Sequence, residues 1–295
     1  MKQPKSILVV VDRGGDVSAL IKKALLLAQV FGARLELFLC DSEQAYVLGH
    51  AYDRAGVGAA RAASVAEARR YLSALRDLAS PAGVDITMDA QCETPLYESV
   101  VRKVLHSVPD MVIKDAPAND AQRHGVSDPN DWQLMRTCPT TLMLSGRRAW
   151  RDPPRFAAAV DVSESETGDL SRSVIETAEL LARGFAAELH VIYGETGSVS
   201  EAAAATQRAK LQRLCAAARI GAGHTHILSG QPERTLPAFL KERGYDALVL
   251  GALAHRSAGT TPVGSLTSTL LDALDCDFVL VKSSSYRSPI ESASP

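Results

Sequence analysis

The sequence lacks the features that mark several large classes of protein. Its five cysteines are far apart, and none forms a Cys-x-x-Cys pair. That spacing argues against a disulfide framework or a zinc knuckle, so we expect ordinary buried thiols. No apolar run approaches the ~20 residues that span a bilayer. The first residues reach Asp12 too early for the apolar core of a signal peptide. We therefore expect a cytoplasmic protein with no membrane partner.

The sequence also has little excess of charge. Lys and Arg number 32 against 34 Asp and Glu, for a net charge of −2, and the basic residues are scattered. A nucleic acid partner is therefore not expected. In contrast, hydrophobic residues make up 46% of the 295 residues. A chain of this length fits about two domains of roughly 100–200 residues, and each could bury its own core.

An internal repeat divides the sequence into two halves, which points to a duplication. Four segments of the first half recur in the same order in the second: SILVVVD (6–12) as RFAAAVD (155–161), ARLELFLC (33–40) as AELHVIYG (187–194), DMVIKDA (110–116) as DALVLGA (246–252), and TCPTTLML (137–144) as DCDFVLVK (275–282). The first half carries 18 additional residues between its second and fourth strands. We expect this insertion, within 41–65, to be a surface loop, with a lid or a ligand-contacting segment as alternatives.

The repeated segments are short and continuously apolar, as in parallel strands that are buried on both faces. Helical patterns separate them. Residues 18–32 place Leu20, Ala24, Leu27 and Phe31 on one stripe, with Gly32 as the predicted end. The alternation predicts an α/β protein with two tandem doubly wound, Rossmann-like domains. We expect each domain to hold a five-stranded parallel sheet with strand order 3-2-1-4-5.

These patterns also predict where the domains begin and end. The first domain is predicted to cover residues 1–146 and the second 155–284. A polar segment that ends in two prolines, 147–154, is the predicted linker. The tail 285–295 has no periodicity, so we expect it to be disordered.

Doubly wound sheets bind ligands outside the carboxyl ends of their strands, where the strand order reverses. The stretch GALAHRSAGTTPVGS (251–265) follows the fourth strand of the second half and lies at such a point. A helix begins near Ser265, with Leu266, Leu270 and Leu274 on one face. A helix N-terminus with glycine and hydroxyl groups can bind an anion. Alternatively, Ser265 only caps its helix and the glycines only form turns.

This stretch resembles the G-x2-G-x9-G-[ST] signature of the universal stress protein family, in its adenine-nucleotide-binding branch. Further resemblance lies in VDVSES after the first strand of the second half, in SGQP followed by DALVLG, and in CDFVLVK at the end. The segment DWQLMR (131–136) is similar to one in the first half of the tandem, E-type subgroup. The resemblance covers nearly the whole chain.

The resemblance implies one site for ATP, with or without Mg²⁺, in the second half. Asp161 and the backbone near Val191 would contact adenine and ribose, and Leu250 and Gly251 would line the nucleoside. Gly264, Ser265 and Leu266 would bind the phosphates. Asp161 has a simpler alternative role as the cap of the turn that follows its strand. Ala254 departs from the family glycine, and a left-handed conformation there would cost roughly 1–2 kcal/mol.

The first half differs at the equivalent positions. Asp115 stands where the second half has Gly251, Ala118 aligns with Ala254, and Val126 and Ser127 align with Gly264 and Ser265. The residues that follow predict a helix start, with Asp128 as the cap, Pro129 in the first turn and Asp131 two residues later. Because these carboxylates would occupy the position of an anion, we expect no ATP site in the first half.

Other chemistry is weakly indicated by the sequence. His224 and His226 form a His-x-His pair near a strand, but two ligands without an evident third predict no metal site. No nucleophile elbow occurs, and no nucleophile–base pair emerges. We therefore expect a non-enzymatic, ATP-binding regulatory protein. The alternatives are a nucleotide-free scaffold or carrier of an apolar metabolite, and an enzyme of the wider adenine-nucleotide-binding α/β group. By family analogy, the two halves would form an internal pseudo-dimer, and whole chains could form a homodimer.

Overall fold

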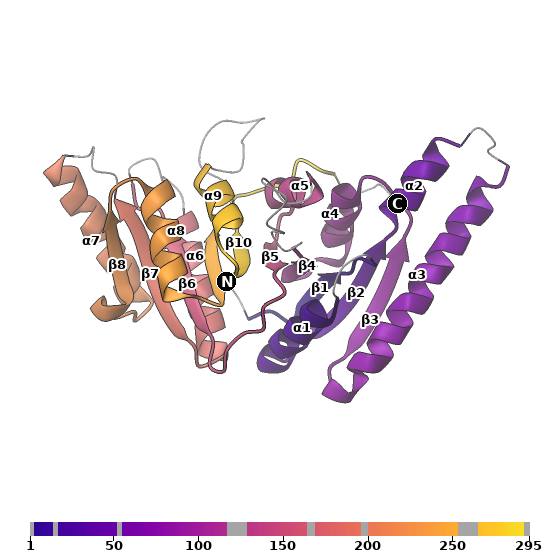
Figure 1. The fold of residues 1–295 in the computed structure, drawn as a ribbon, viewed down its shortest axis with the longest axis horizontal. Helices are drawn as coiled ribbons and strands as arrows, with labels where there is room; N and C mark the ends of the chain where they lie inside the picture. Colours follow the sequence, from indigo (N-terminus) through magenta and orange to yellow (C-terminus); the bar gives the residue numbers. More distant parts are fainter. Residues whose placement is uncertain are drawn as a thin grey trace. The chain divides into compact units, whose positions relative to one another are not determined.

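The structure of the protein is a computed structural model that describes residues 3–13, 17–51, 55–116, 129–163, 169–195, 200–252 and 265–291. Two compact units divide the chain between Arg147 and Arg148. Each unit is an α/β sheet with helices on its faces (Figure 1). Residues 285–291, in the predicted tail, include a turn and a bend, and 292–295 lie outside the described residues.

The first unit contains a five-stranded sheet in the order β3-β2-β1-β4-β5, and every pair of neighbouring strands is parallel. Its elements, in chain order, are β1 (Ser6–Val10), α1 (Val17–Phe31), β2 (Arg34–Cys40), α2 (Ser42–Gly49), α3 (Val57–Ala79), η1 (Ser80–Ala82), β3 (Ile86–Gln91), α4 (Leu96–Ser107), β4 (Met111–Asp115), α5 (Pro129–Thr137) and β5 (Thr141–Ser145).

The second unit repeats this order as β8-β7-β6-β9-β10, again with parallel neighbours. Its elements are β6 (Arg155–Val160), α6 (Leu170–Gly184), β7 (Glu188–Glu195), α7 (Glu201–Ala217), η2 (Ala222–His224), β8 (Thr225–Ser229), α8 (Pro232–Arg243), β9 (Ala247–Gly251), α9 (Ser265–Ala273) and β10 (Asp277–Val281). The predicted fold class, with two tandem doubly wound sheets of order 3-2-1-4-5, is confirmed.

The helix α1 shows how the apolar stripe determines the local structure. Its predicted core residues Leu20, Ala24, Leu27 and Phe31 are all buried, so the stripe faces the sheet. The helix ends at Gly32, which adopts a φ of +63°. This left-handed conformation is readily available to glycine and terminates the helix where the sequence predicts.

The insertion in the first half is helical, so the prediction of a surface loop was wrong. Residues 42–49 form α2, and α3 begins at Val57. The Asp41 carboxylate caps α2 by accepting the Gln44 N–H (3.1 Å) and also accepts the Ser64 hydroxyl of α3 (2.7 Å). This one side chain therefore joins the two helices. Residues 52–54, between them, lie outside the described residues.

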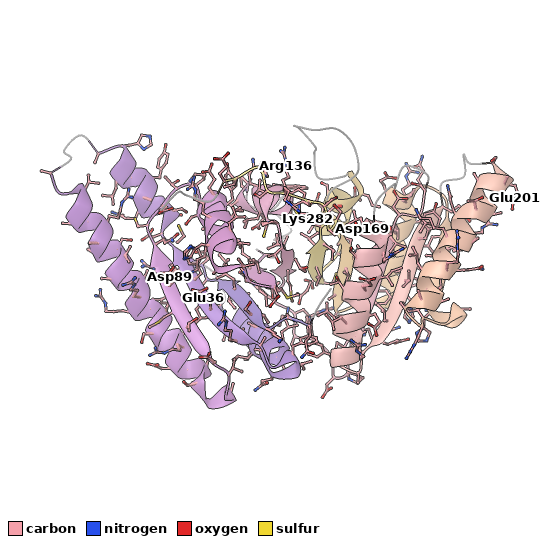
Figure 2. All side chains as sticks on the ribbon, turned by 180° about the vertical axis from the view of Figure 1, so that it is seen from behind. Glu36, Asp89, Arg136, Asp169, Glu201 and Lys282 are labelled. Carbon is pink, nitrogen blue, oxygen red and sulfur yellow. The ribbon has the colours of Figure 1, made fainter. Side chains whose placement is uncertain are left out.

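A lysine of α4 fastens two strands of the first sheet. Lys103 Nζ lies 2.6 Å from a carboxylate oxygen of Glu36 on β2 and 3.0 Å from one of Asp89 on β3. The two carboxylates lie on neighbouring strands (Figure 2). Desolvation lowers the pKa of Lys103, but hydrogen bonds to Glu36 and Asp89 more than offset this effect and raise it above the usual value.

One carboxylate in each unit ties the first strand to the fourth. In the first unit, Asp110 accepts the backbone N–H groups of Lys5 (2.8 Å) and Ser6 (3.0 Å) just before β4. In the second unit, Asp246 accepts the N–H of Arg155 (2.8 Å) just before β9. The same contact at equivalent positions of the two repeats aligns the amino ends of the paired strands.

The second unit adds charged and aromatic contacts around this carboxylate. Asp246 is only 2% exposed, and Arg151 Nε donates to it at 3.0 Å. Trp150 Nε1 donates to Asp277 at 2.6 Å, and its ring packs edge-on against Phe156, with 5.4 Å between centroids. The predicted linker is therefore fixed to the second unit at Trp150 and Arg151.

Four of the five cysteines are buried and Cys276 is half-buried, and all five are free thiols. Burial raises the pKa of Cys40 and Cys215 above the usual value for a thiol. In the part of the chain that the structure describes, no helix combines the length and apolar composition needed to cross a membrane.

Removing the Asp246 carboxylate should destabilise the second unit by about 3 kcal/mol, because it leaves a buried N–H and the Arg151 guanidinium without their acceptor. Asp110→Ala should cost the first unit only about 1 kcal/mol, because that carboxylate mainly accepts from neutral backbone groups. Trp132 and Trp150 are the two tryptophans. Urea titrations of Asp246→Ala in a Trp132→Phe background would follow the second unit, and Asp110→Ala in Trp150→Phe the first. Equal losses would contradict the expected difference.

Candidate nucleotide site

The candidate site lies at the carboxyl edge of the second sheet, at the switch point between β6 and β9. These two strands are parallel neighbours, and Ala159 pairs with Leu250. Their ends therefore lie at the same level, which places Asp161, just after β6, close to Gly251 at the end of β9. Leu250 is buried at 4% exposure, and Gly251 is half-buried. The structure brings these three predicted residues to one edge.

Asp161 performs the simpler of its two predicted roles. Its Oδ1 accepts the N–H of Ser163 at 2.8 Å, which caps the turn after β6. Its backbone carbonyl accepts the Ser171 hydroxyl from the first turn of α6. The carboxylate is exposed, so a hydroxyl of a ligand can still reach it. The cap thus orients a side chain that remains accessible.

Gly251 has a packing reason to lack a side chain. A Cβ at this position would lie 2.6 Å from Cδ2 of Leu170, the first residue of α6. The Leu170 side chain therefore occupies the space beside the end of β9. This close approach explains the glycine without a ligand, and it also gives the edge an apolar wall suited to a flat ring.

Val191 does not lie at this edge. It is fully buried within β7, where it pairs with Ala158 and Thr225, and the strand continues to Glu195. The β7 residue beside the end of β6 is Tyr193, which pairs with Val160.

Tyr193 and Glu195 are the polar residues that β7 contributes near this edge, and the sequence did not single them out. The Tyr193 hydroxyl donates to Gln207 at 2.7 Å, and burial, with smaller effects from Asp161 and Glu195, raises its pKa to about 12. Glu195 is buried and ion-paired with Arg208 at 2.8 Å. Both side chains thus interact with residues of α7, one through a hydrogen bond and the other through an ion pair.

Of the residues predicted to bind phosphate, only Ser265 and Leu266 lie within the described part of the chain. Ser265 begins α9, as predicted, and Leu266 is half-buried in its first turn. Ala254 and Gly264 lie outside the described residues. The Asp169 carboxylate, just before α6, accepts the Ser284 hydroxyl at 2.5 Å.

At the equivalent edge of the first unit, a buried ion pair stands at the end of the fourth strand. Lys114, near the end of β4, lies 2.8 Å from the carboxylate of Asp131 in α5. Asp131 is 0% exposed and Lys114 is 4% exposed. The repeat aligns Lys114 with Leu250, so the charges lie where the second unit is apolar. The helix α5 begins at Pro129, as predicted, while Ala118 and 126–128 lie outside the described residues.

Three histidines and two partners form a polar cluster at the opposite, amino-terminal side of the second sheet. His190 of β7 contacts Glu188, His226 and Tyr245 through hydrogen bonds of 2.8 to 2.9 Å. The sequence singles out only His224 and His226, which are two residues apart in the chain. Glu188 and His190 alternate on the preceding strand, and this spacing was the signal that could have added them to the two histidines that the sequence singled out.

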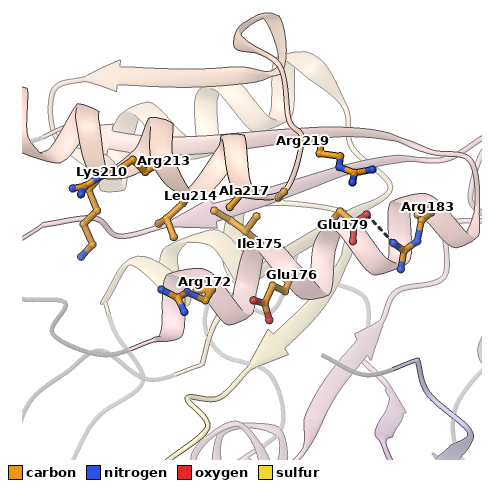
Figure 3. A pocket seen from close by; sticks show the side chains of 11 residues that line it. Arg172, Ile175, Glu176, Glu179, Arg183, Lys210, Arg213, Leu214, Ala217 and Arg219 are labelled. Atoms are coloured by element: carbon orange, nitrogen blue, oxygen red, sulfur yellow. Dashed lines mark ion pairs between the residues drawn. The ribbon is translucent and has the colours of Figure 1, made fainter.

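A separate groove of about 690 Å³ lies between α6 and α7 (Figure 3). Its lining includes five cationic side chains and two carboxylates: Arg172, Arg183, Lys210, Arg213, Arg219, Glu176 and Glu179. Arg183 and Glu179 form an ion pair of 3.3 Å across one helical turn. The predicted nucleotide residues do not line this groove, and its charged walls are poorly suited to an apolar ligand.

Breaking the buried Lys114–Asp131 ion pair should lower the free energy of unfolding of the first unit. Asp131→Leu leaves Lys114 as a buried charge without this carboxylate and should destabilise the unit by about 3–5 kcal/mol. The double variant Lys114→Met/Asp131→Leu should recover more than half of that loss, because two apolar side chains need no counter-charge. Urea unfolding, monitored through the adjacent Trp132, measures the coupling in a double-mutant cycle. Additive losses in the double variant would show that the two charges do not act as a pair.

Comparison with known proteins agrees with this arrangement. Residues 155–282 match the model of the universal stress protein family. Universal stress protein E of Escherichia coli strain K12 is 23% identical over 317 aligned positions, which cover 99% of this chain and 98% of that protein.

Two solved structures share the fold over nearly the whole chain. A universal stress protein from Pseudomonas aeruginosa superposes with a TM-score of 0.75 at 21% identity, covering 95% of this chain and 94% of that one. One from Archaeoglobus fulgidus has a TM-score of 0.68 at 15% identity, with 98% of each chain covered. The matched domain, the relatives of equal length and the repeated fold agree with one another: residues 155–282 match the universal stress protein family, and nearly the whole chain is similar to E-type universal stress proteins and repeats the same fold twice.

Proposed function

We propose that this protein binds ATP, with or without Mg²⁺, in its second unit and acts in the stress response through regulation or protein contacts. The observation that carries the proposal is the contrast between the two equivalent edges. The first unit has a buried ion pair, Lys114 with Asp131. The repeat aligns Lys114 with Leu250 and, by the offset of the fifth strands, Asp131 with Thr269, so the second unit has neither charge. In the first unit, two opposite charges pair with each other at this edge. In the second unit, the same edge is apolar and lies beside the N-terminus of α9.

The local geometry of the second unit supports an adenine nucleotide. Leu170 and Leu250 provide apolar surface near the ends of β6 and β9, and the exposed Asp161 carboxylate can accept a ribose hydroxyl. The nine-residue helix α9 begins at Ser265. The first N–H groups of a helix have no partner within the helix, and such an N-terminus suits a phosphate. The sequence from Gly251 to Ser265 keeps the spacing of the family signature, with Ala254 as the departure.

A binding role without dedicated catalysis fits the polar groups at this edge. Catalysis of phosphoryl transfer requires a group that positions the attacking nucleophile. Glu195 is paired with Arg208, and the Asp161 carboxylate caps its own turn. We therefore propose that any hydrolysis of ATP is slow and incidental. A homodimer of whole chains is part of the same proposal, by analogy with the family.

Purified protein should bind labelled ATP saturably, at one site per chain and below about millimolar concentration. Gly264→Asp should weaken binding about 10-fold or more, because it places a carboxylate beside the phosphates. Its matched control is Val126→Asp, the equivalent change in the first half, which should leave ATP affinity unchanged.

Ala254→Gly should tighten ATP binding by about 5- to 30-fold if the position needs a left-handed backbone.

Two outcomes would contradict ATP binding in the second unit. Absence of saturation up to millimolar ATP, with both variants folded by circular dichroism, would reject the nucleotide and favour the scaffold. Loss of binding in Val126→Asp but not in Gly264→Asp would move the site to the first unit.

A further inference from the structure

The histidine cluster of the second unit has the composition and spacing of a metal site. Glu188, His190 and His224 each offer one ligand atom, and these atoms lie within 4.8 Å of one another. Two imidazoles and one carboxylate are a ligand set typical of zinc sites that keep an open fourth position. We propose that Glu188, His190 and His224 bind a divalent transition metal ion of the zinc class.

Strand pairing brings these residues together. Val191 of β7 pairs with Thr225 of β8, so the segments just before them run side by side. The ring centroids of His190 and His224 lie 5.0 Å apart, and those of His190 and His226 lie 4.9 Å apart. His190 thus lies in β7 and His226 in β8, and His224 is the last residue of η2, directly before β8. Such a scaffold holds ligands with little loss of entropy on binding.

The tautomer of His224 suits a ligand. Its Nδ1 lies 3.2 Å from the backbone carbonyl of Leu189. A carbonyl can only accept, so Nδ1 carries the proton and Nε2 keeps its lone pair. An Nδ1–H bonded to a backbone carbonyl is the usual outer support of a metal-binding histidine.

His190 is supported in the same way. Its Nε2 faces Glu188 Oε1 at 2.8 Å, while its Nδ1 lies 2.9 Å from both Tyr245 Oη and His226 Nε2. Without a metal, Nε2–H donates to the carboxylate and Nδ1 accepts. With a metal on Nε2, the proton moves to Nδ1, which then donates to the tyrosine oxygen or to the His226 nitrogen. Both partners can donate or accept, so the ring satisfies either state.

Glu188 is oriented by its second oxygen. Arg155 Nε donates to Oε2 at 2.7 Å, which leaves Oε1 directed toward His190. Arg155 is itself held by the Arg243 carbonyl at 3.0 Å and lies over the Tyr245 ring. The guanidinium reduces the attraction for a cation, so we expect moderate affinity. It also fixes the carboxylate rotamer that the ligand set needs.

The site is accessible and needs only small adjustments. Glu188 and His224 are exposed and His190 is buried, so the ion would lie at the surface with its fourth position open to water. Bond lengths of about 2.0–2.2 Å place tetrahedral ligand atoms roughly 3.3 Å apart. The 2.8 Å contact between Glu188 and His190 would open slightly, and the His224 ring would move inward. A bound ion would join β7 to the segment before β8, the edge strand.

The test uses the full chain without an affinity tag. Co²⁺ should bind at one ion per chain and give the visible absorption bands of a tetrahedral site, and Zn²⁺ should displace it. Zn²⁺ but not Mg²⁺ should raise the melting temperature, because imidazole ligands favour the zinc class. His224→Ala and Glu188→Gln should each abolish the Co²⁺ bands and weaken Zn²⁺ binding about 100-fold or more.

Two control variants distinguish the proposed ligands from other histidines. His226→Gln should keep the Co²⁺ bands with binding weakened about 10-fold, because His226 supports His190 rather than the ion. His50→Ala, in the first unit, should change nothing. The proposal is overturned if Zn²⁺ does not saturate below about 0.1 mM, if His224→Ala retains the bands, or if His226→Gln removes them. Circular dichroism confirms that each variant is folded.

Discussion

The carboxylates of Asp110 and Asp246 hold the amino ends of the first and fourth strands of each sheet together, and the position of the candidate site depends on this alignment. Because β6 and β9 start at the same level and have similar lengths, they bring Asp161 and Gly251 to one edge. In doubly wound folds, ligands bind in the crevice outside the carboxyl ends of the strands, at the point where the strand order reverses. In the second unit, arginine side chains strengthen the same alignment.

The fold could be predicted because its signal is repeated and local. Continuous apolar runs identify buried parallel strands, and the α1 stripe with Gly32 marks one helix and its end. The insertion was predicted less well, because its helices depend on a contact between distant residues. Asp41 caps α2 and also accepts from Ser64. Sequence spacing alone does not reveal such a pairing, so a helical segment resembled a loop.

The site could be predicted only where it follows strand ends. Asp161 and Gly251 follow or end their strands, as the pattern predicts, whereas Val191 lies inside β7, which continues to Glu195. Side-chain contacts between separate elements could not be predicted from the sequence. Lys114 interrupts an apolar strand, and only the structure shows that its partner is Asp131, one helix later. Likewise, the pairing of β7 with β8 brings Glu188 and His190 near His224, which is the one residue of the proposed ligand set that the sequence singled out.

The Lys114–Asp131 pair also has an evolutionary consequence. A buried charge is tolerated beside its partner but is costly alone. A descendant that restored an open apolar edge in the first unit would have to replace both residues, and each single replacement passes through an unstable intermediate. The burial of both charges therefore disfavours stepwise replacement of the pair by the apolar arrangement of the second unit.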